Sequence, residues 1–274
     1  METSATLAPP APVARSGHAA HPVYRVTAPT PLRNRWDAEE FSKRSFVWHA
    51  ATHTPPGSLV LDAGGGTRTH AAYFPHATYE SCDLVADPAI PHDYICDVKS
   101  IPVPEGRFDT VLCIQVLDDV PDPQAVVDEF FRILRPGGSL FLTVPMSGRL
   151  HNEPYHFFQF TRYGLDLLFR RAGFEVRAIA PRGGAGWYLN YMCRKVPDYL
   201  RKQLPKACAA AAKDPAASLP RRALLNAARL IATPAYWLTA PLTRIALPWL
   251  CFHLDAMDHD KAFTLGYACH VVKR

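Results

Sequence analysis

Three consecutive glycines that follow a short apolar run constrain this chain more than any other feature. The apolar run 59–61 ends in Asp62, residues 64–66 are all glycine, and a helix-compatible segment follows. Glycine lets the backbone approach a ligand closely, and a helix N-terminus offers unpaired N–H groups to an anion. We therefore expect a strand, a glycine-rich turn and a helix that together bind a ligand.

A second acid follows at the spacing that a nucleotide site requires. Asp83 ends the next strand-like run, 78–83, about twenty residues after the glycines, where a doubly wound fold places a carboxylate on ribose hydroxyls. The sequence therefore predicts a cofactor that contains adenosine.

Strand-like and helix-like segments alternate along most of the chain, which predicts an α/β fold with a parallel sheet. The strands are expected at 59–63, 78–83, 94–97, 109–114, 139–145, 174–181 and 262–274, and the helices at 37–52, 67–74, 122–134 and 161–173. In such folds ligands bind beyond the carboxyl ends of the strands. Asp62, Asp83, Asp97 and Gln115 all lie at or just past such ends.

With these motifs in view, the chain resembles the class I S-adenosylmethionine-dependent methyltransferases of the type 11 group. The resemblance covers roughly 37–181 and the final strand, and it rests on the order of VLDAGGGT, CDVKSIPVPEGRFDTVLCIQVLDDVPDP, RILRPGGSLFLTVP and HNEPYHFFQFTRYGLDLLFRRAGF. It implies a doubly wound, Rossmann-like, seven-stranded mixed sheet whose last two strands form a hairpin.

The resemblance also implies roles at the methionine end of S-adenosylmethionine. Asp62 would hold the ammonium group through the loop, and Gly64 and Gly66 would let the cofactor lie against the backbone. Gln115 would line the pocket behind the sulfonium. Carboxylates suit a ligand that carries two positive centres.

At the adenosine end, the resemblance implies that Asp83 bridges the ribose hydroxyls. Asp97 would accept a hydrogen bond from the adenine amino group, and Val98 would lie beside the ring. A nicotinamide dehydrogenase is disfavoured, because Thr69 stands where its G-x-G-x-x-G motif needs glycine.

Two histidines are candidates for acceptor chemistry. His151 and His156 flank the segment that faces the acceptor in this fold, and histidine titrates near neutral pH. Either could be a general base or a structural residue. His156 and Gln159 replace the usual Asp and Arg of the family. This difference leaves a second hypothesis open, namely a catalytically degenerate protein that binds the cofactor and only scaffolds or regulates a partner. Asp118 and Asp119 could bind a metal ion, but the sequence suggests no third ligand beside them, so we expect no metal site.

The segment 182–262 is too long for a loop without structure of its own. Between residues 182 and 254 there are eleven lysines and arginines against two acids, a net charge of +9, whereas the remainder carries −4. The second part of this range, 224–254, is a very apolar run with Trp237 and Trp249, and it contains prolines that disfavour a regular helix. The insert is therefore either a helical lid or, through 199–254, an element for an anionic membrane surface. No nucleic-acid recognition motif is present, which disfavours that partner.

We therefore divide the chain into a disordered tail at 1–30, a methyltransferase core at 31–181, a basic, apolar helical insert at 182–262 and a final core strand at 263–274. The expected function is transfer of a methyl group, by O-methylation, to a small or lipid-linked acceptor. Seven unpatterned cysteines favour a cytoplasmic protein, with peripheral membrane contact through the insert.

Overall fold

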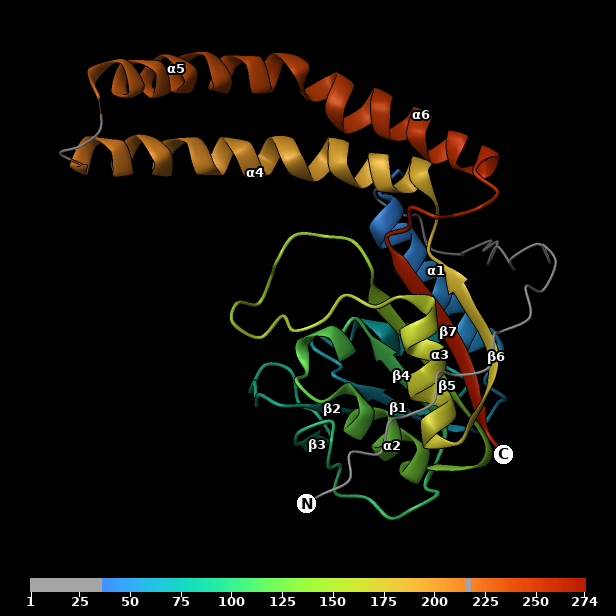
Figure 1. Ribbon diagram of the computed structural model, residues 1–274. Helices are drawn as coiled ribbons and strands as arrows, with labels where there is room; N and C mark the ends of the chain where they lie inside the picture. Colours follow the sequence, from blue (N-terminus) through green and yellow to red (C-terminus); the bar gives the residue numbers. More distant parts are fainter. Residues whose placement is uncertain (1–35, 215–217) are drawn as a thin grey trace, which may run out of the picture.

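The computed structural model describes residues 36–214 and 218–274, so the tail expected at 1–30 lies outside the described residues. A twisted sheet with helices on both faces forms the body of the molecule, and a long helical hairpin projects from one end (Figure 1).

The sheet has seven strands in the order β3-β2-β1-β4-β5-β7-β6. The strands are β1 (Leu59–Ala63), β2 (Thr78–Asp83), β3 (Tyr94–Ile95), β4 (Phe108–Ile114), β5 (Leu134–Pro145), β6 (Phe174–Pro181) and β7 (Gly266–Lys273). Within the described sheet β7 alone runs in the opposite direction to the other strands, and it lies between β5 and β6. The expected doubly wound, mixed, Rossmann-like sheet is confirmed.

The helices of the body begin and end where the sequence places caps. They are α1 (Ala38–Thr52), α2 (Pro123–Ile133) and α3 (Arg162–Ala172). Side chains of Asp37, Asp122 and Thr161 accept hydrogen bonds from first-turn N–H groups at 3.1–3.2 Å. Gly173, with φ +96°, ends α3 in the left-handed conformation that glycine adopts without strain.

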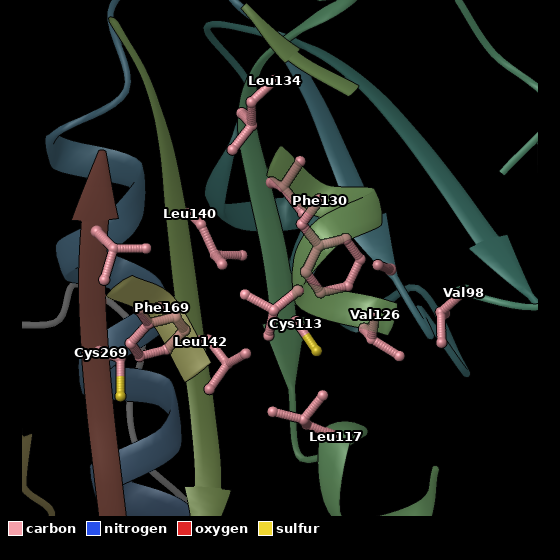
Figure 2. Close-up of a cluster of buried hydrophobic side chains, with 14 of the residues drawn as sticks. Val98, Cys113, Leu117, Val126, Phe130, Leu134, Leu140, Leu142, Phe169 and Cys269 are labelled. Atoms are coloured by element: carbon pink, nitrogen blue, oxygen red, sulfur yellow. The ribbon is translucent and has the colours of Figure 1, made fainter. Parts of the chain in front are cut away.

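Successive side chains of the central strands point to opposite faces of the sheet, and both faces are buried. On one face, Val111 and Cys113 of β4 pack with Phe130 of α2 and Phe169 of α3. Figure 2 shows this cluster between β4, β5, β7 and the two helices. On the other face, Leu112 packs beneath α1. Burial on both faces explains why these strands read as nearly continuous apolar runs.

Four expected boundaries are wrong. The strand expected at 94–97 ends at Ile95, so Asp97 lies two residues past β3. The helix expected at 67–74 is a short 3-10 helix, η1 (Thr69–Tyr73), because Arg68 adopts a left-handed conformation with φ 54° and delays the helix start. β5 begins at Leu134 rather than residue 139, since the Pro-Gly-Gly segment bends within the strand instead of separating helix from strand. β7 begins at Gly266, later than residue 262.

The insert forms a hairpin of two long helical arms, α4 and α5, that run side by side away from the sheet (Figure 1). Its elements are α4 (Ala185–Lys213), α5 (Leu219–Pro241), a π-helical stretch (Leu242–Ala246) and α6 (Leu247–Leu254). α4 begins directly after Gly184, so the insert is helical almost from its first residue.

The prolines do not stop the two arms, but the second arm becomes irregular between Pro241 and Pro248, where prolines were expected to disfavour a regular helix. Pro197 and Pro205 lie inside α4, and Pro234 lies inside α5. The π-helical stretch precedes Pro248, which lacks the N–H that a regular turn would donate to Arg244. The wider π-helical turn therefore lets the helix continue past Pro248 without that hydrogen bond. None of the helices in the described ranges combines the length and hydrophobicity needed to cross a bilayer.

A buried polar network fixes the base of the hairpin to the body. The side chain of Asn190 is fully buried, donates to the carbonyls of Trp36 and Pro248 at 2.7 Å each, and accepts from the Ala38 amide at 3.3 Å. Asp255 accepts from the amides of Gly184 and Trp187 at 2.8 and 2.9 Å. The start of α4 is thus bound to both α1 and the end of α6.

Candidate active site

The turn after β1, which we call the glycine loop (residues 62–66), requires glycine for steric reasons. Gly64 has φ +75°, and a Cβ there would lie 2.5 Å from a methyl carbon of Val116. The amides of Gly64 and Gly65 donate to the Cys82 carbonyl at 2.9 and 3.0 Å. The loop is therefore held tightly between the ends of β2 and β4.

Asp62 is the first residue of this loop, and its side chain is almost completely buried. Its Oδ2 accepts a hydrogen bond from the Tyr79 hydroxyl and lies 3.0 Å from Nδ1 of His70. Burial, reinforced by the Asp62 carboxylate, raises the pKa of Tyr79, so the phenol keeps its proton and donates. Oδ1 of Asp62 is buried and has no partner within the described residues.

Two further acids lie at the ends of β2 and β3. Asp83 Oδ2 accepts from the Gly66 amide at 3.0 Å, and its Oδ1 accepts from the Val85 amide at 3.3 Å. Asp97 Oδ1 accepts from the Lys99 amide at 2.9 Å. Val98 is buried in the core beside Asp97. Asp62, the glycines, Asp83 and Asp97 thus share the carboxyl edge of the sheet, as expected.

Gln115 directly follows β4 and adopts a left-handed conformation with φ 58°. Its Nε2 donates to Thr143 Oγ1 at 3.1 Å, and its Oε1 lies 3.5 Å from Nη2 of Arg182. A cavity of about 560 Å³ opens next to it, within the size range of ligand pockets. Glu40, Arg44, Thr69, His70 and Ile114 line this cavity together with Gln115.

Arg182 is a site residue that the sequence reasoning missed. Its side chain is only 4% exposed, and burial lowers its pKa to about 10, so it remains charged at neutral pH. Its Nε has no partner among the residues described. Arg182 follows β6 directly, so the rule about strand ends could have identified it; the sequence reasoning counted it only in the charge of the insert.

A second cluster forms where the loop after β5 folds back on the short helix η2 (Leu117–Asp119). The amides of Phe157 and Phe158 donate to the Asp118 carbonyl at 2.9 and 3.2 Å, and Asn152 Nδ2 donates to Asp119 Oδ2 at 2.6 Å. These bonds bring His151 and His156 against Asp118. We call Asp118, His151 and His156 the aspartate–histidine cluster.

The ligand atoms of this cluster lie within 4.8 Å of one another. His151 Nε2 is 3.4 Å from Asp118 Oδ2, and the two imidazole rings are 4.1 Å apart between centroids. The Asp118 side chain is fully buried, which raises its pKa. The sequence suggested no third ligand for Asp118, because the two histidines lie more than thirty residues further along the chain.

The glycine loop and the aspartate–histidine cluster are neighbours. Gly64 packs against Val116, and Asp118 follows two residues later on the same turn. One side of this edge therefore presents a loop for a ligand with hydroxyl or amino groups, and the other presents imidazoles and a carboxylate that can hold a proton or a cation.

Comparison with known proteins identifies the family. A family model described as "Methyltransferase domain" matches residues 42–179, half of the chain. An uncharacterized methyltransferase of Mycobacterium sp. (strain KMS) is 35% identical over 108 residues, which cover 35% of this chain and 43% of that protein. A ubiquinone biosynthesis O-methyltransferase of Xanthomonas campestris is 32% identical over 135 residues, or 41% of this chain and 56% of the relative.

The chain spans about half the length of the curated relatives that it matches. Among solved structures, the [4+2]-cyclase SpnF has a TM-score of 0.50 and 18% identity, and the match covers 84% of this chain and 80% of SpnF. That likeness concerns the fold alone. The family match and the sheet order together show that the chain belongs to the class I S-adenosylmethionine-dependent methyltransferases.

Proposed function

We propose that the protein transfers the methyl group of S-adenosylmethionine to an oxygen atom of a small or lipid-linked acceptor. The observation that carries the proposal is the placement of the glycine loop and the aspartate–histidine cluster side by side at one edge of the sheet, through the contact of Gly64 with Val116. Such a site aligns donor and acceptor and excludes water, which is most of what this reaction needs.

The residues at the glycine loop fit the cofactor on two observations. No atom lies within 4 Å of the place that a Cβ of Gly66 would take, so the backbone there is open to a ligand, and Asp62 Oδ1 is a buried acceptor without a partner in the described chain. We propose that Asp62 attracts the ammonium group through the loop, that Gly64 and Gly66 lie against the cofactor, and that Gln115 lines the pocket behind the sulfonium.

We propose that Asp83 holds the ribose hydroxyls and that Asp97 accepts from the adenine amino group, with Val98 beside the ring. Asp83 already accepts two backbone N–H groups and Asp97 accepts one, which fixes the orientation of both acids before a ligand arrives. Carboxylates fixed in this way lose little entropy on binding.

The bound cofactor supplies an electrophilic methyl group at its sulfonium. On the other side of the site, His151 and His156 are placed to assist removal of the acceptor's hydroxyl proton while its oxygen takes the methyl group. Arg182 adds a buried positive charge near Gln115, which favours an acceptor with an anionic or strongly polar group. Similarity to a ubiquinone biosynthesis O-methyltransferase supports an oxygen acceptor.

The helical hairpin supports an acceptor that is carried in a membrane. Large apolar side chains are exposed along the arm formed by α5, the π-helical stretch and α6: Leu230, Trp237, Leu238, Leu242, Ile245 and Trp249. Exposed basic residues, among them Arg201, Lys202 and Lys206, lie on α4. We propose that this hairpin rests in the interface of an anionic leaflet, with tryptophan at the boundary and basic side chains near headgroups.

The hairpin leaves the body at the same edge of the sheet as the candidate site (Figure 1). Peripheral contact there would hold the site near a lipid-linked acceptor. All seven cysteines are free, as expected for a protein at the cytoplasmic face of a membrane.

The experiment that tests this function measures S-adenosylhomocysteine release when the purified protein is incubated with S-adenosylmethionine and a bacterial lipid extract. We expect release that depends on the extract and a methylated product that partitions into organic solvent. Tight cofactor binding without turnover on lipid or water-soluble fractions would contradict the enzyme and favour the scaffold alternative.

A further inference from the structure

Several buried polar atoms without partners converge at the aspartate–histidine cluster. Both carboxylate oxygens of Asp118, Oδ1 of Asp119 and Nε2 of His156 are buried and have no hydrogen-bond partner in the described part of the chain. A buried polar atom without a partner is costly, and most such atoms in proteins are satisfied by a protein group, a water molecule or an ion. Here four of them meet at one place.

The chemistry of the donors narrows the choice of ligand. Two imidazoles and a carboxylate suit transition-metal cations, whereas Mg²⁺ and Ca²⁺ prefer oxygen ligands throughout. Tetrahedral zinc with bonds of about 2.0–2.2 Å places neighbouring ligand atoms about 3.4 Å apart. His151 Nε2 and Asp118 Oδ2 already stand at 3.4 Å. The remaining distances lie within 4.8 Å, so rotation of the imidazoles completes the set.

We propose that Asp118, His151 and His156 bind a divalent transition-metal cation of the Zn²⁺ or Fe²⁺ type, with one position open to the acceptor oxygen. Three protein ligands with an open position are characteristic of catalytic sites, whereas structural zinc sites are closed by four. The role of the open position rests on the proposed methyl transfer; the binding of the cation does not.

Surrounding contacts hold the ligands in place. Asn152 bonds to Asp119, and the amides of Phe157 and Phe158 bond to the Asp118 carbonyl, so the loop that carries both histidines is already fastened to η2. His156 Nδ1 lies 3.3 Å from the His151 amide. Coordination through Nε2 places the proton of the neutral ring on Nδ1, which then no longer accepts from that amide, so this contact must open when the cation binds.

The cation changes how the two histidines assist the reaction. An acceptor hydroxyl bound at the open position is acidified, as water is on catalytic zinc, and releases its proton to solvent. The resulting oxygen forms a bond to the methyl carbon while the carbon–sulfur bond breaks, and the electron pair of that bond remains on sulfur in S-adenosylhomocysteine. The histidines then serve as ligands and do not accept the proton themselves.

The test uses the full chain without a histidine tag, stripped of metal, and Zn²⁺ as the probe. We expect Zn²⁺ to bind at one ion per chain. Because the chain has seven free cysteines, zinc-edge X-ray absorption must show nitrogen and oxygen neighbours at about 2.0–2.1 Å and no sulfur at about 2.3 Å. Sulfur ligands, or weak binding at several sites, would overturn the proposal.

Three variants locate the ion. His151→Ala, whose side chain is partly exposed, and Asp118→Asn should each weaken Zn²⁺ binding by at least about tenfold. His259→Ala removes an exposed histidine outside the cluster and should leave binding unchanged. Circular dichroism checks that each variant is folded; if Asp118→Asn is not, His151→Ala alone decides. A folded His151→Ala protein that binds Zn²⁺ like wild type would contradict the site.

The same preparation separates this inference from the proposed function. Stoichiometric Zn²⁺ binding through nitrogen and oxygen, with no turnover under any acceptor condition, would leave the metal site standing and refute methyl transfer. Turnover that is unaffected by a chelator, in a protein that binds no Zn²⁺, would refute the metal site and leave methyl transfer standing.

Discussion

The glycine loop and the aspartate–histidine cluster lie side by side, but their polar groups are held differently. On the side of the glycine loop, Asp62 accepts hydrogen bonds from His70 and Tyr79, and Asp83 at the end of β2 accepts from the Gly66 amide. In the cluster, the Asp118 carboxylate has an imidazole at ion-pair distance, but neither oxygen has a hydrogen-bond partner within the described residues. On the first side, Oδ1 of Asp62 is the one buried side-chain atom without a partner among the described residues, whereas on the second side four such atoms depend on a ligand.

This difference predicts that substitutions on the two sides affect different properties of the enzyme. Changes in the cluster should alter the reaction and spare cofactor affinity, and changes at the loop acids should alter cofactor affinity. The hairpin should affect neither in the absence of a membrane. Each prediction below tests one part of this division.

The largest effect is expected in the cluster. Replacement of His151 or His156 by alanine should lower turnover by about 100- to 10,000-fold, because either role, proton acceptor or metal ligand, acts on the acceptor's hydroxyl. The affinity for S-adenosylmethionine should remain that of wild type. Steady-state turnover and calorimetry measure the two quantities, with His259→Ala as the control. Full turnover in both single variants would remove the histidines from the chemistry.

At the loop acids, Asp83→Ala should weaken S-adenosylmethionine binding by about 1.5–3 kcal/mol, the usual scale for hydrogen bonds to a charged group. Calorimetry measures the change, and Asp87→Ala, an exposed acid four residues further along, serves as the matched control. Wild-type affinity in the Asp83 variant would refute the ribose assignment.

Much of the loop side could be predicted from sequence because its residues lie at strand ends in one contiguous pattern. Asp62, Gly64, Gly66 and Asp83 lie at the edge where the alternation of strands and helices predicts them. The cluster could not be predicted in this way. Asp118 and His151 are distant in sequence, and only the fold of the loop after β5 brings them together.

The insert shows the same limit for secondary structure. Its prolines indicated interrupted helices, yet α4 and α5 continue through Pro197, Pro205 and Pro234, and the chain between Pro241 and Pro248 becomes π-helical instead of ending the arm. Composition did predict a helical, basic and apolar element. The number and direction of its helices depend on tertiary contacts such as those of Asn190, which no local pattern reveals.

On the hairpin, Trp237→Ser should weaken binding to vesicles that contain anionic lipid by about tenfold, because an indole that is 63% exposed loses its place in the interface. Tyr163→Ser, at a residue that is 64% exposed on the body, is the matched control and should change nothing. Salt should weaken vesicle binding of the wild type, since it screens the attraction between the basic side chains of α4 and the anionic headgroups. Vesicle binding that is equal in both variants would refute the role of Trp237, and a wild-type protein that ignores anionic vesicles at low salt would return the insert to the role of a lid.

The smallest effect concerns histidines of the body rather than of the site. Burial lowers the pKa of His270 to about 4, and neighbouring His53 adds to this. Between about pH 6.5 and pH 4 the unfolded chain therefore binds a proton that the folded chain does not. The free energy of unfolding should fall as the pH falls through this window, by at most about 1.4 kcal/mol per pH unit for this group. Urea titrations at pH 7 and pH 5 should show a shallower fall in His270→Leu; an unchanged fall would contradict the assignment.

The most direct test of the central claim is a pair of calorimetric titrations of the full chain, one with S-adenosylmethionine and one with NAD. The organised glycine loop, with Asp83 and Asp97 at the neighbouring strand ends, predicts saturable binding of S-adenosylmethionine at one site and no binding of NAD. Binding of NAD instead, or of neither, would contradict the assignment of this edge of the sheet as a methyl-donor site.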